Sequence, residues 1–82
     1  MARLELYGTA SCPYTQELRE SLEWNRRQFQ EYDIEADPKA RQRLRSIDSS
    51  LYTVPVLVED GKVIQIGWQG RGCVVSWGGH DA

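Results

Sequence analysis

The sequence predicts an α/β domain built on a four-stranded mixed sheet, with helices on its faces and the element order β-α-β-α-β-β. Short segments of alternating apolar and polar residues are separated by segments with a helical repeat. Prolines stand at the expected first position of both helices, at 13 and 38. Asp60-Gly61 is typical of a tight hairpin turn between the last two strands. Because a helix joins the first two strands, they should be parallel, whereas the hairpin strands should be antiparallel.

The first strand is expected over residues 3–7. Leu4 and Leu6 fall on one face of this segment, and Arg3 and Glu5 fall on the other. Alternation of this kind is typical of a strand with one face in the core.

The first helix is expected from Pro13 to about Asn25. Tyr14, Leu18 and Leu22 recur every four residues and form its apolar stripe. The charged residues of this segment fall mostly off the stripe, so they are expected to face solvent.

A second strand is expected over residues 29–35, and a second helix over residues 38–47. Asp37 should cap this helix, with a proline in its first turn. The arginines at 41, 43 and 45 alternate around the helix and do not form one stripe. They therefore predict a solvated surface and not a phosphate groove.

Thr53-Val54-Pro55 begins the next apolar segment. A proline removes a hydrogen-bond donor from a strand, so it belongs at the start of a strand or at a bend. This position suits a cis Val54–Pro55 bond and an ordinary turn about equally well. Strands at 56–59 and 62–66 should then pair as a hairpin, and the glycine-rich residues 67–73 follow them, with a short helix or turn near residues 71–77.

Composition indicates one small domain over residues 1–77 and a flexible tail over 78–82. The net charge of −2 points to no nucleic-acid partner. No apolar run approaches the roughly 20 residues of a membrane span, and the N-terminus lacks the apolar core of a signal peptide. We therefore expect a cytoplasmic monomer with no membrane partner.

The 2 cysteines are too few for a disulfide framework and too far apart for a zinc knuckle. No metal site is expected, and His80 should be solvated. The cysteines are better explained by a reactive thiol in a reducing compartment.

Cys12 lies where the first strand ends and the first helix begins. The unpaired N–H groups and positive end of a helix stabilise an anion, so the pKa of this thiol should be lowered. A thiolate is the nucleophile of thiol–disulfide exchange. The alternative is a small buried hydrophobe, but packing alone hardly explains Cys-Pro at a strand-to-helix junction.

The chain resembles the glutaredoxins, small proteins of the thioredoxin fold, in residues 6–15 and 53–55. The first segment reads LYGTASCPYT, similar to the C-P-Y-C or C-x-x-S site of the family, and the second reads TVP. The similarity covers about residues 4–67 and includes a small bacterial branch in which some members carry selenocysteine at the nucleophile position. The resemblance implies that Cys12 attacks protein or small-molecule disulfides and that Pro55 is cis.

The same resemblance implies a substrate-binding surface around the thiol, with the backbone of Val54 free to pair with an extended substrate segment. Thr9 and Gly67-Trp68 stand where the family usually has a basic residue and a Gly-Gly pair that help hold glutathione. The reductant therefore stays open between glutathione as a co-substrate and a donor of the thioredoxin-reductase type, and no cofactor is required. The residues expected on this surface are Pro13, Tyr14, Thr53, Val54, Pro55, Gly67 and Trp68.

Thr15 and Cys73 complete the expected catalytic set with Cys12. Thr15 stands where a dithiol glutaredoxin has its second cysteine, and it either donates a hydrogen bond to the Cys12 thiolate or is a spectator. Cys73 either resolves a mixed disulfide on Cys12 or packs as a small hydrophobe. The first role requires the two Cα atoms to come within about 7 Å.

The missing second cysteine also fits a different function, a [2Fe-2S] module. In such glutaredoxins two subunits each contribute one protein thiolate and one glutathione thiolate, although their motif is typically C-G-F-S. A third alternative is a thioredoxin-fold adaptor without turnover.

Overall fold

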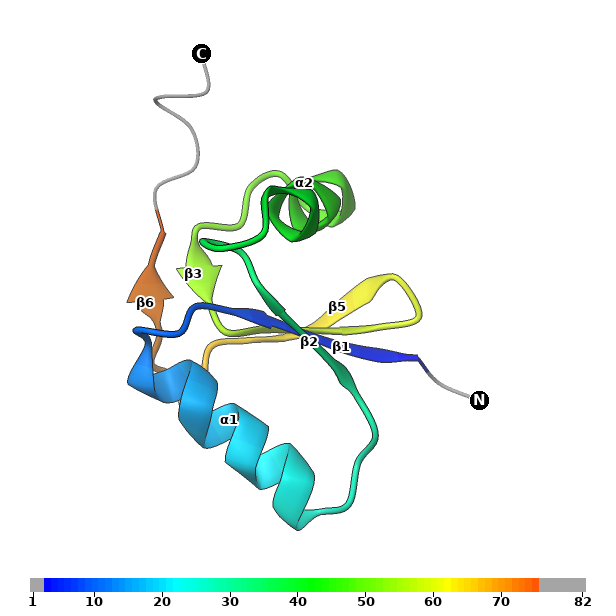
Figure 1. Ribbon diagram of the computed structural model, residues 1–82, viewed down its shortest axis with the longest axis vertical. Coiled ribbons are helices and arrows are strands. Elements are labelled where there is room, and N and C mark those ends of the chain that lie inside the picture. The colour runs from blue at the N-terminus through cyan, green and yellow to red at the C-terminus, as the bar shows by residue number, and fades with distance from the viewer. Residues whose placement is uncertain (1–2, 76–82) are drawn as a thin grey trace.

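The computed structural model describes residues 3–75. Its elements in chain order are β1 (Leu4–Gly8), α1 (Pro13–Trp24), β2 (Gln30–Asp33), α2 (Pro38–Ile47), β3 (Thr53–Val54), β4 (Val56–Glu59), β5 (Lys62–Ile66) and β6 (Cys73–Val74). A four-stranded sheet in the order β2-β1-β4-β5 forms the middle layer, and β3 and β6 form a separate two-stranded sheet. Figure 1 shows α1 and α2 on opposite sides of the larger sheet, as predicted.

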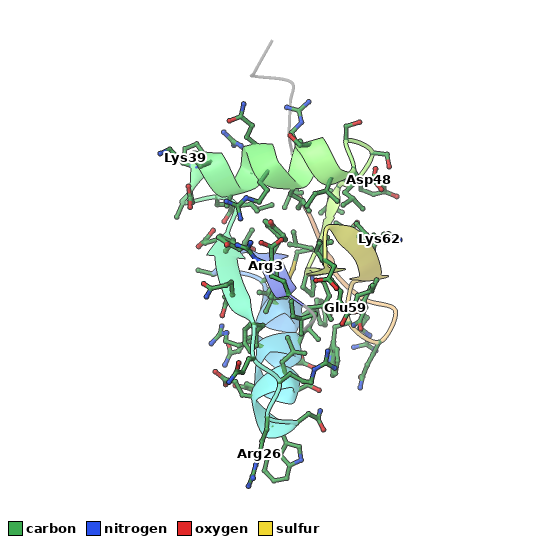
Figure 2. All side chains as sticks on the ribbon, turned by 90° about the vertical axis from the view of Figure 1, so that its right-hand side faces the viewer. Arg3, Arg26, Lys39, Asp48, Glu59 and Lys62 are labelled. Atoms are coloured by element: carbon green, nitrogen blue, oxygen red, sulfur yellow. A yellow bond between two sulfur atoms is a disulfide. The ribbon has the colours of Figure 1, made fainter. Side chains whose placement is uncertain are left out.

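The pairing within the larger sheet is mixed, which confirms the predicted fold class. β1 pairs in parallel with β2 and antiparallel with β4, and β4 pairs antiparallel with β5. The hairpin turn is Asp60-Gly61, where φ is 51° and 83°. Positive φ at both central positions is what a type I′ turn requires. Figure 2 shows α2 across the top of the sheet, with Lys39 and Asp48 near its ends and Arg26 at the far end of α1.

The central strand β1 is buried on both faces, although the alternation of its residues indicated only one face in the core. Leu4 and Leu6 pack in a cluster with Leu18 of α1. The opposite face carries Tyr7, which packs in a second cluster together with residues of α2. Glu5 is also buried, at 6% exposure. The reason is that β1 lies between two strands and beneath a helix on each side, which alternation within one strand does not indicate.

The buried Glu5 carboxylate is held by a polar network below α2. It accepts a hydrogen bond from the Tyr7 hydroxyl at 3.1 Å and one from the Arg43 guanidinium at 3.2 Å. Arg43 also donates to the Tyr32 hydroxyl at 3.1 Å. Arg43 is therefore not simply a solvated side chain, which corrects that part of the prediction for the arginines of this helix. Burial, reinforced by the nearby negative Glu5, raises the pKa of Tyr7 well above its usual value.

α1 ends at Trp24, which is 86% exposed, and Asn25 caps the helix, in agreement with the expected end at about Asn25. One element boundary differs from the prediction. β2 is shorter than the predicted segment, because the Asp33 carboxylate accepts the backbone N–H groups of Glu35 and Ala36 in a turn. The predicted cap of α2 is confirmed: Asp37 accepts hydrogen bonds from two backbone N–H groups of the first turn.

Residues 53–58 do not form one continuous strand. The Val54–Pro55 peptide bond is cis, and it separates β3 from β4. The predicted helix or turn near residues 71–77 was wrong for the described part, because Cys73 and Val74 form the strand β6. Residues 76–82, with Trp77, His80 and the predicted tail, lie outside the described residues. Neither α1 nor α2 is long and apolar enough to cross a membrane.

Candidate functional site

Cys12 occupies the predicted position at the start of α1. It is the N-cap residue, with φ −90° and ψ 115°, and Pro13 follows in the first turn. The backbone N–H of Cys12 donates to the Thr9 carbonyl at 3.2 Å, which fixes the chain between β1 and α1. The first turn of the helix contains no acidic residue. A thiolate at this position would therefore meet the positive end of the helix without a competing negative charge in that turn.

Thr15 packs against the end of β1. Its side chain is 2% exposed, and a β-carbon on Gly8 would collide with it, Thr15 Cβ being only 2.9 Å away. Glycine at residue 8 thus lets the first turn of α1 approach the strand closely. The Thr15 hydroxyl has no hydrogen-bond partner within residues 3–75 in this oxidised form. Its donation to a Cys12 thiolate stays a prediction for the reduced protein.

The chain reaches Cys73 through a second tight turn. Trp68 and Arg71 exchange two backbone hydrogen bonds, at 2.7 and 2.9 Å. Between them Gln69 and Gly70 have φ of 53° and 78°, the same signs as in the Asp60-Gly61 turn. This turn is not predicted from the sequence, because Gln-Gly is a weaker signal than Asn-Gly or Asp-Gly. The glycine-rich residues 67–73 therefore contain a defined reversal of the chain.

This reversal places β6 against β3. Cys73 lies opposite Val54 in an antiparallel ladder, and Val74 lies opposite Thr53. The Val75 N–H extends the pairing by donating to the Tyr52 carbonyl at 2.7 Å. The prediction that the Val54 backbone is free for a substrate was therefore wrong for this form of the protein, since the chain pairs with its own strand.

Gly72 permits the close contact between the two strands. A β-carbon at this position would lie 2.7 Å from the Val54 carbonyl oxygen. No real side chain tolerates such a distance to backbone, so residue 72 must be glycine for β6 to lie here. The sequence gives no signal for this role of Gly72, since the contact partner is 18 positions earlier and meets it only in the folded chain.

Cys12 and Cys73 are joined by a disulfide. Their Cα atoms lie 6.0 Å apart although 61 positions separate them in sequence. Of the two alternatives for Cys73, the structure thus brings it to Cys12, and it is not just a packed hydrophobe. Cys12 is 2% exposed, so its sulfur is not open to an external partner in this oxidised form. Its Sγ lies 3.9 Å from the Val54 carbonyl oxygen, which therefore lies beside the disulfide.

The other predicted surface residues divide into two groups. Tyr14 is half-buried and packs on the same core cluster as Cys12 and Val54. Trp68 instead packs against the cluster on the α1 side of the sheet, and its indole N–H donates to Glu17 at 3.1 Å. The structure therefore places Tyr14 with the sulfurs but directs Trp68 towards α1. Of the remaining predicted residues, Pro13 is exposed, Thr53 is half-buried, and the buried ones are Pro55 and Gly67.

Among residues 3–75, no three His, Cys, Asp or Glu side chains are grouped so that they could hold a metal ion. The described part of the site thus consists of two sulfurs, one helix terminus and one strand edge. This set of groups can perform thiol–disulfide exchange.

Known proteins resemble this chain in both sequence and fold. A family model described as Glutaredoxin matches residues 4–64. The crystal structure of the thioredoxin-like protein BC3987 is similar with a TM-score of 0.71 and 34% identity, covering 82% of this chain and 89% of that one. The glutaredoxin grx-1 from Archaeoglobus fulgidus gives a TM-score of 0.68 and 27% identity, covering 84% of this chain and 78% of that one.

Glutaredoxin 1 from Francisella tularensis, crystallised with cacodylate, shares the fold alone. Its TM-score is 0.60 at 23% identity, covering 83% of this chain and 85% of that one. No curated protein matches the chain.

Proposed function

The chain belongs to the glutaredoxin family, and we propose that it is a thiol–disulfide oxidoreductase whose redox pair is Cys12 and Cys73. The observation that supports this function is the disulfide between these residues at the N-terminus of α1. A helix terminus stabilises a thiolate. A second sulfur within bonding distance can attack the mixed disulfide that this thiolate forms with a substrate.

The proposed reaction has two exchange steps. The Cys12 thiolate attacks one sulfur of a substrate disulfide, and the other substrate sulfur leaves as a thiolate. The Cys73 thiolate then attacks Cys12 Sγ in the mixed disulfide and releases the second substrate thiolate. The substrate has gained two electrons, and the protein is left with the Cys12–Cys73 disulfide of this structure.

Attack on a substrate requires Cys12 to become accessible after reduction. In the oxidised form β6, a strand of only 2 residues, covers Cys12. The segment that connects β5 to β6 contains Gly67, Gly70 and Gly72. Once the disulfide is broken, β6 is held by its short ladder with β3, by the hydrogen bond from Val75 to Tyr52 and by the packing of Cys73 and Val75 on the core. We infer that β6 then leaves β3 and that an extended substrate segment pairs with Val54 instead. The proposed substrates are disulfides of proteins or of small molecules.

Two reductants are candidates: glutathione and a donor of the thioredoxin-reductase type. Thr9, at the position where the family usually carries a basic residue, is 5% exposed and offers no positive charge to a glutathione carboxylate. This favours the second donor. We further propose that the protein acts in the cytoplasm, a reducing compartment in which the disulfide would be transient.

Two assays test the function. The protein is supplied with a glutathione mixed disulfide plus glutathione, and separately with insulin plus NADPH and thioredoxin reductase. We expect turnover in the second assay, and we expect Cys12→Ser to abolish it. Cys73→Ser should stop turnover by the reductase, because no internal disulfide can form. Full activity of the Cys12→Ser variant in either assay would contradict the proposal.

The [2Fe-2S] alternative has less support. Such a module needs glutathione bound beside Cys12, whereas Thr9 is 5% exposed and offers no positive charge to a glutathione carboxylate. Anaerobic reconstitution distinguishes the alternatives: a stable brown dimer that needs glutathione would favour the module, and a colourless monomer the oxidoreductase.

A further inference from the structure

The two sulfurs of the disulfide differ in their access to solvent. Cys12 is 2% exposed and belongs to a core cluster that includes Val54 and Tyr14. Cys73 packs against the same cluster but is only half-buried, so it keeps part of its surface in contact with solvent. Of the two cysteines, Cys73 is thus the one that a thiol approaching the oxidised protein from solvent reaches first.

The two sulfurs also differ as leaving groups. In thiol–disulfide exchange the sulfur that is not attacked departs as a thiolate, and it departs faster when its thiol pKa is low. Cys12 is the N-cap of a helix of 12 residues with no acidic residue in its first turn. Cys73 lies in the strand β6, and within residues 3–75 its sulfur meets the terminus of α1 only through its bond to Cys12. The helix terminus therefore favours Cys12 as the leaving sulfur, and the lower burial of Cys73 favours Cys73 as the sulfur that is attacked.

We propose that the oxidised protein is reduced through Cys73, so that electrons arrive at this sulfur and leave through Cys12. This inference rests on the proposed function. The reductant is a thiol, and its thiolate attacks Cys73 Sγ. The bond between the two protein sulfurs breaks, and Cys12 departs with the electron pair as a thiolate. A mixed disulfide then joins the reductant to Cys73.

A second thiolate completes the reduction. It attacks the reductant's sulfur in this mixed disulfide, the Cys73 thiolate departs and takes up a proton from water, and the reductant is released as a disulfide. Two electrons have passed to the protein. While the adduct exists, the reductant is attached to β6, and removal of β6 from β3 uncovers the Cys12 thiolate for substrate.

Mapping the first adduct tests the proposal. The oxidised full-length protein is mixed with 2-mercaptoethanol, quenched at a series of short times with acidic N-ethylmaleimide, and digested with trypsin. Cleavage after Arg19 and Arg71 places the two cysteines in different peptides. We expect mercaptoethanol on Cys73 and maleimide on Cys12, exceeding the opposite arrangement by at least about tenfold after extrapolation to zero time. The extrapolation removes later transfer between the cysteines.

The same protein unfolded in guanidinium chloride is the matched control, since it has neither the burial nor the helix terminus. There the two arrangements should form in similar amounts. An excess of adduct on Cys12 in the folded protein, or a folded ratio equal to the unfolded one, would overturn this inference but leave the proposed function intact. A folded protein whose disulfide the thiol does not reduce would also overturn this inference, whereas the proposed function fails only if the reductase assay shows no turnover that depends on Cys12.

Discussion

Cys73 is the antiparallel partner of Val54 in the ladder between β6 and β3. The carbonyl of the same Val54 also lies 3.9 Å from Sγ of Cys12, so one residue of β3 contacts both partners of the disulfide. Because β6 has only 2 residues, this arrangement depends on close packing between the two strands.

Replacing Gly72 by Ala should weaken the Cys12–Cys73 disulfide. The added β-carbon would lie 2.7 Å from the Val54 carbonyl oxygen, and forced overpacking of this kind costs about 1–3 kcal/mol. The equilibrium constant for forming the disulfide in a glutathione redox buffer should then fall about five- to 150-fold. Quantifying free thiols after acid quenching measures it. Val74→Ala, in the same strand but at an exposed side chain, is the control and should keep the wild-type constant. Equal constants for all three proteins would show that Gly72 does not control the approach of β6.

The charge of residue 16 should shift the pKa of Cys12. Gln16 is exposed, and its backbone N–H donates to the Cys12 carbonyl at 3.4 Å, one turn into α1. In a Cys73→Ser background, Gln16→Glu should raise the Cys12 pKa and Gln16→Lys should lower it. Each shift should be about 0.2–0.7 units, the size of a charge effect at a helix terminus. The rate of alkylation by iodoacetamide as a function of pH gives both values. Shifts of the same sign in both variants would exclude an electrostatic origin.

Replacing Arg43 by Met should destabilise the protein. The Glu5 carboxylate is 8% exposed and would lose its 3.2 Å partner, keeping the Tyr7 hydroxyl at 3.1 Å and Arg3 at 3.7 Å. Loss of a charged partner by a buried acceptor costs about 1–3 kcal/mol. Urea unfolding at neutral pH measures the loss of free energy. Arg41→Met removes the same charge from the same helix and should change the stability by less than about 0.5 kcal/mol. If Arg43→Met were as stable as the Arg41 variant, the ion pair would contribute nothing.

Stability should fall at alkaline pH because of Tyr7. Burial and the adjacent Glu5 raise the pKa of Tyr7 in the folded protein above its ordinary value of about 10. Below pH 10 Tyr7 is protonated in both the folded and the unfolded protein, so its full contribution to the free energy of unfolding is present. Above it, the unfolded chain releases a proton that the folded protein keeps, so stability decreases by at most about 1.4 kcal/mol per pH unit until the folded pKa is reached.

Tyr7→Phe should remove this alkaline slope, which urea unfolding between pH 9 and pH 11 would record. It should also lower stability at neutral pH by about 0.5–1.5 kcal/mol, because the hydrogen bond to Glu5 is lost. Tyr52→Phe is the control at a ring that is 62% exposed, and it should keep the wild-type slope. An unchanged slope in Tyr7→Phe would assign the alkaline loss to other groups.

The sequence by itself determined the features that depend on neighbouring residues. Pro13 and Pro38 fix the starts of both helices, Asp60-Gly61 fixes the hairpin, and alternation marks the strands, because these signals act within a few positions. The position of Cys12 at a helix terminus follows from the same local pattern.

Only the tertiary structure decided which residues from distant parts of the sequence come into contact. Burial of Glu5 depends on Arg43 of α2, and the position of Cys73 depends on a turn at Gln69-Gly70 and on the absence of a side chain at Gly72. Such contacts join residues that lie 18 to 61 positions apart, as Gly72–Val54 and Cys73–Cys12 do. No local repeat encodes them, since they arise only when strands and helices pack together and the space between them becomes limiting.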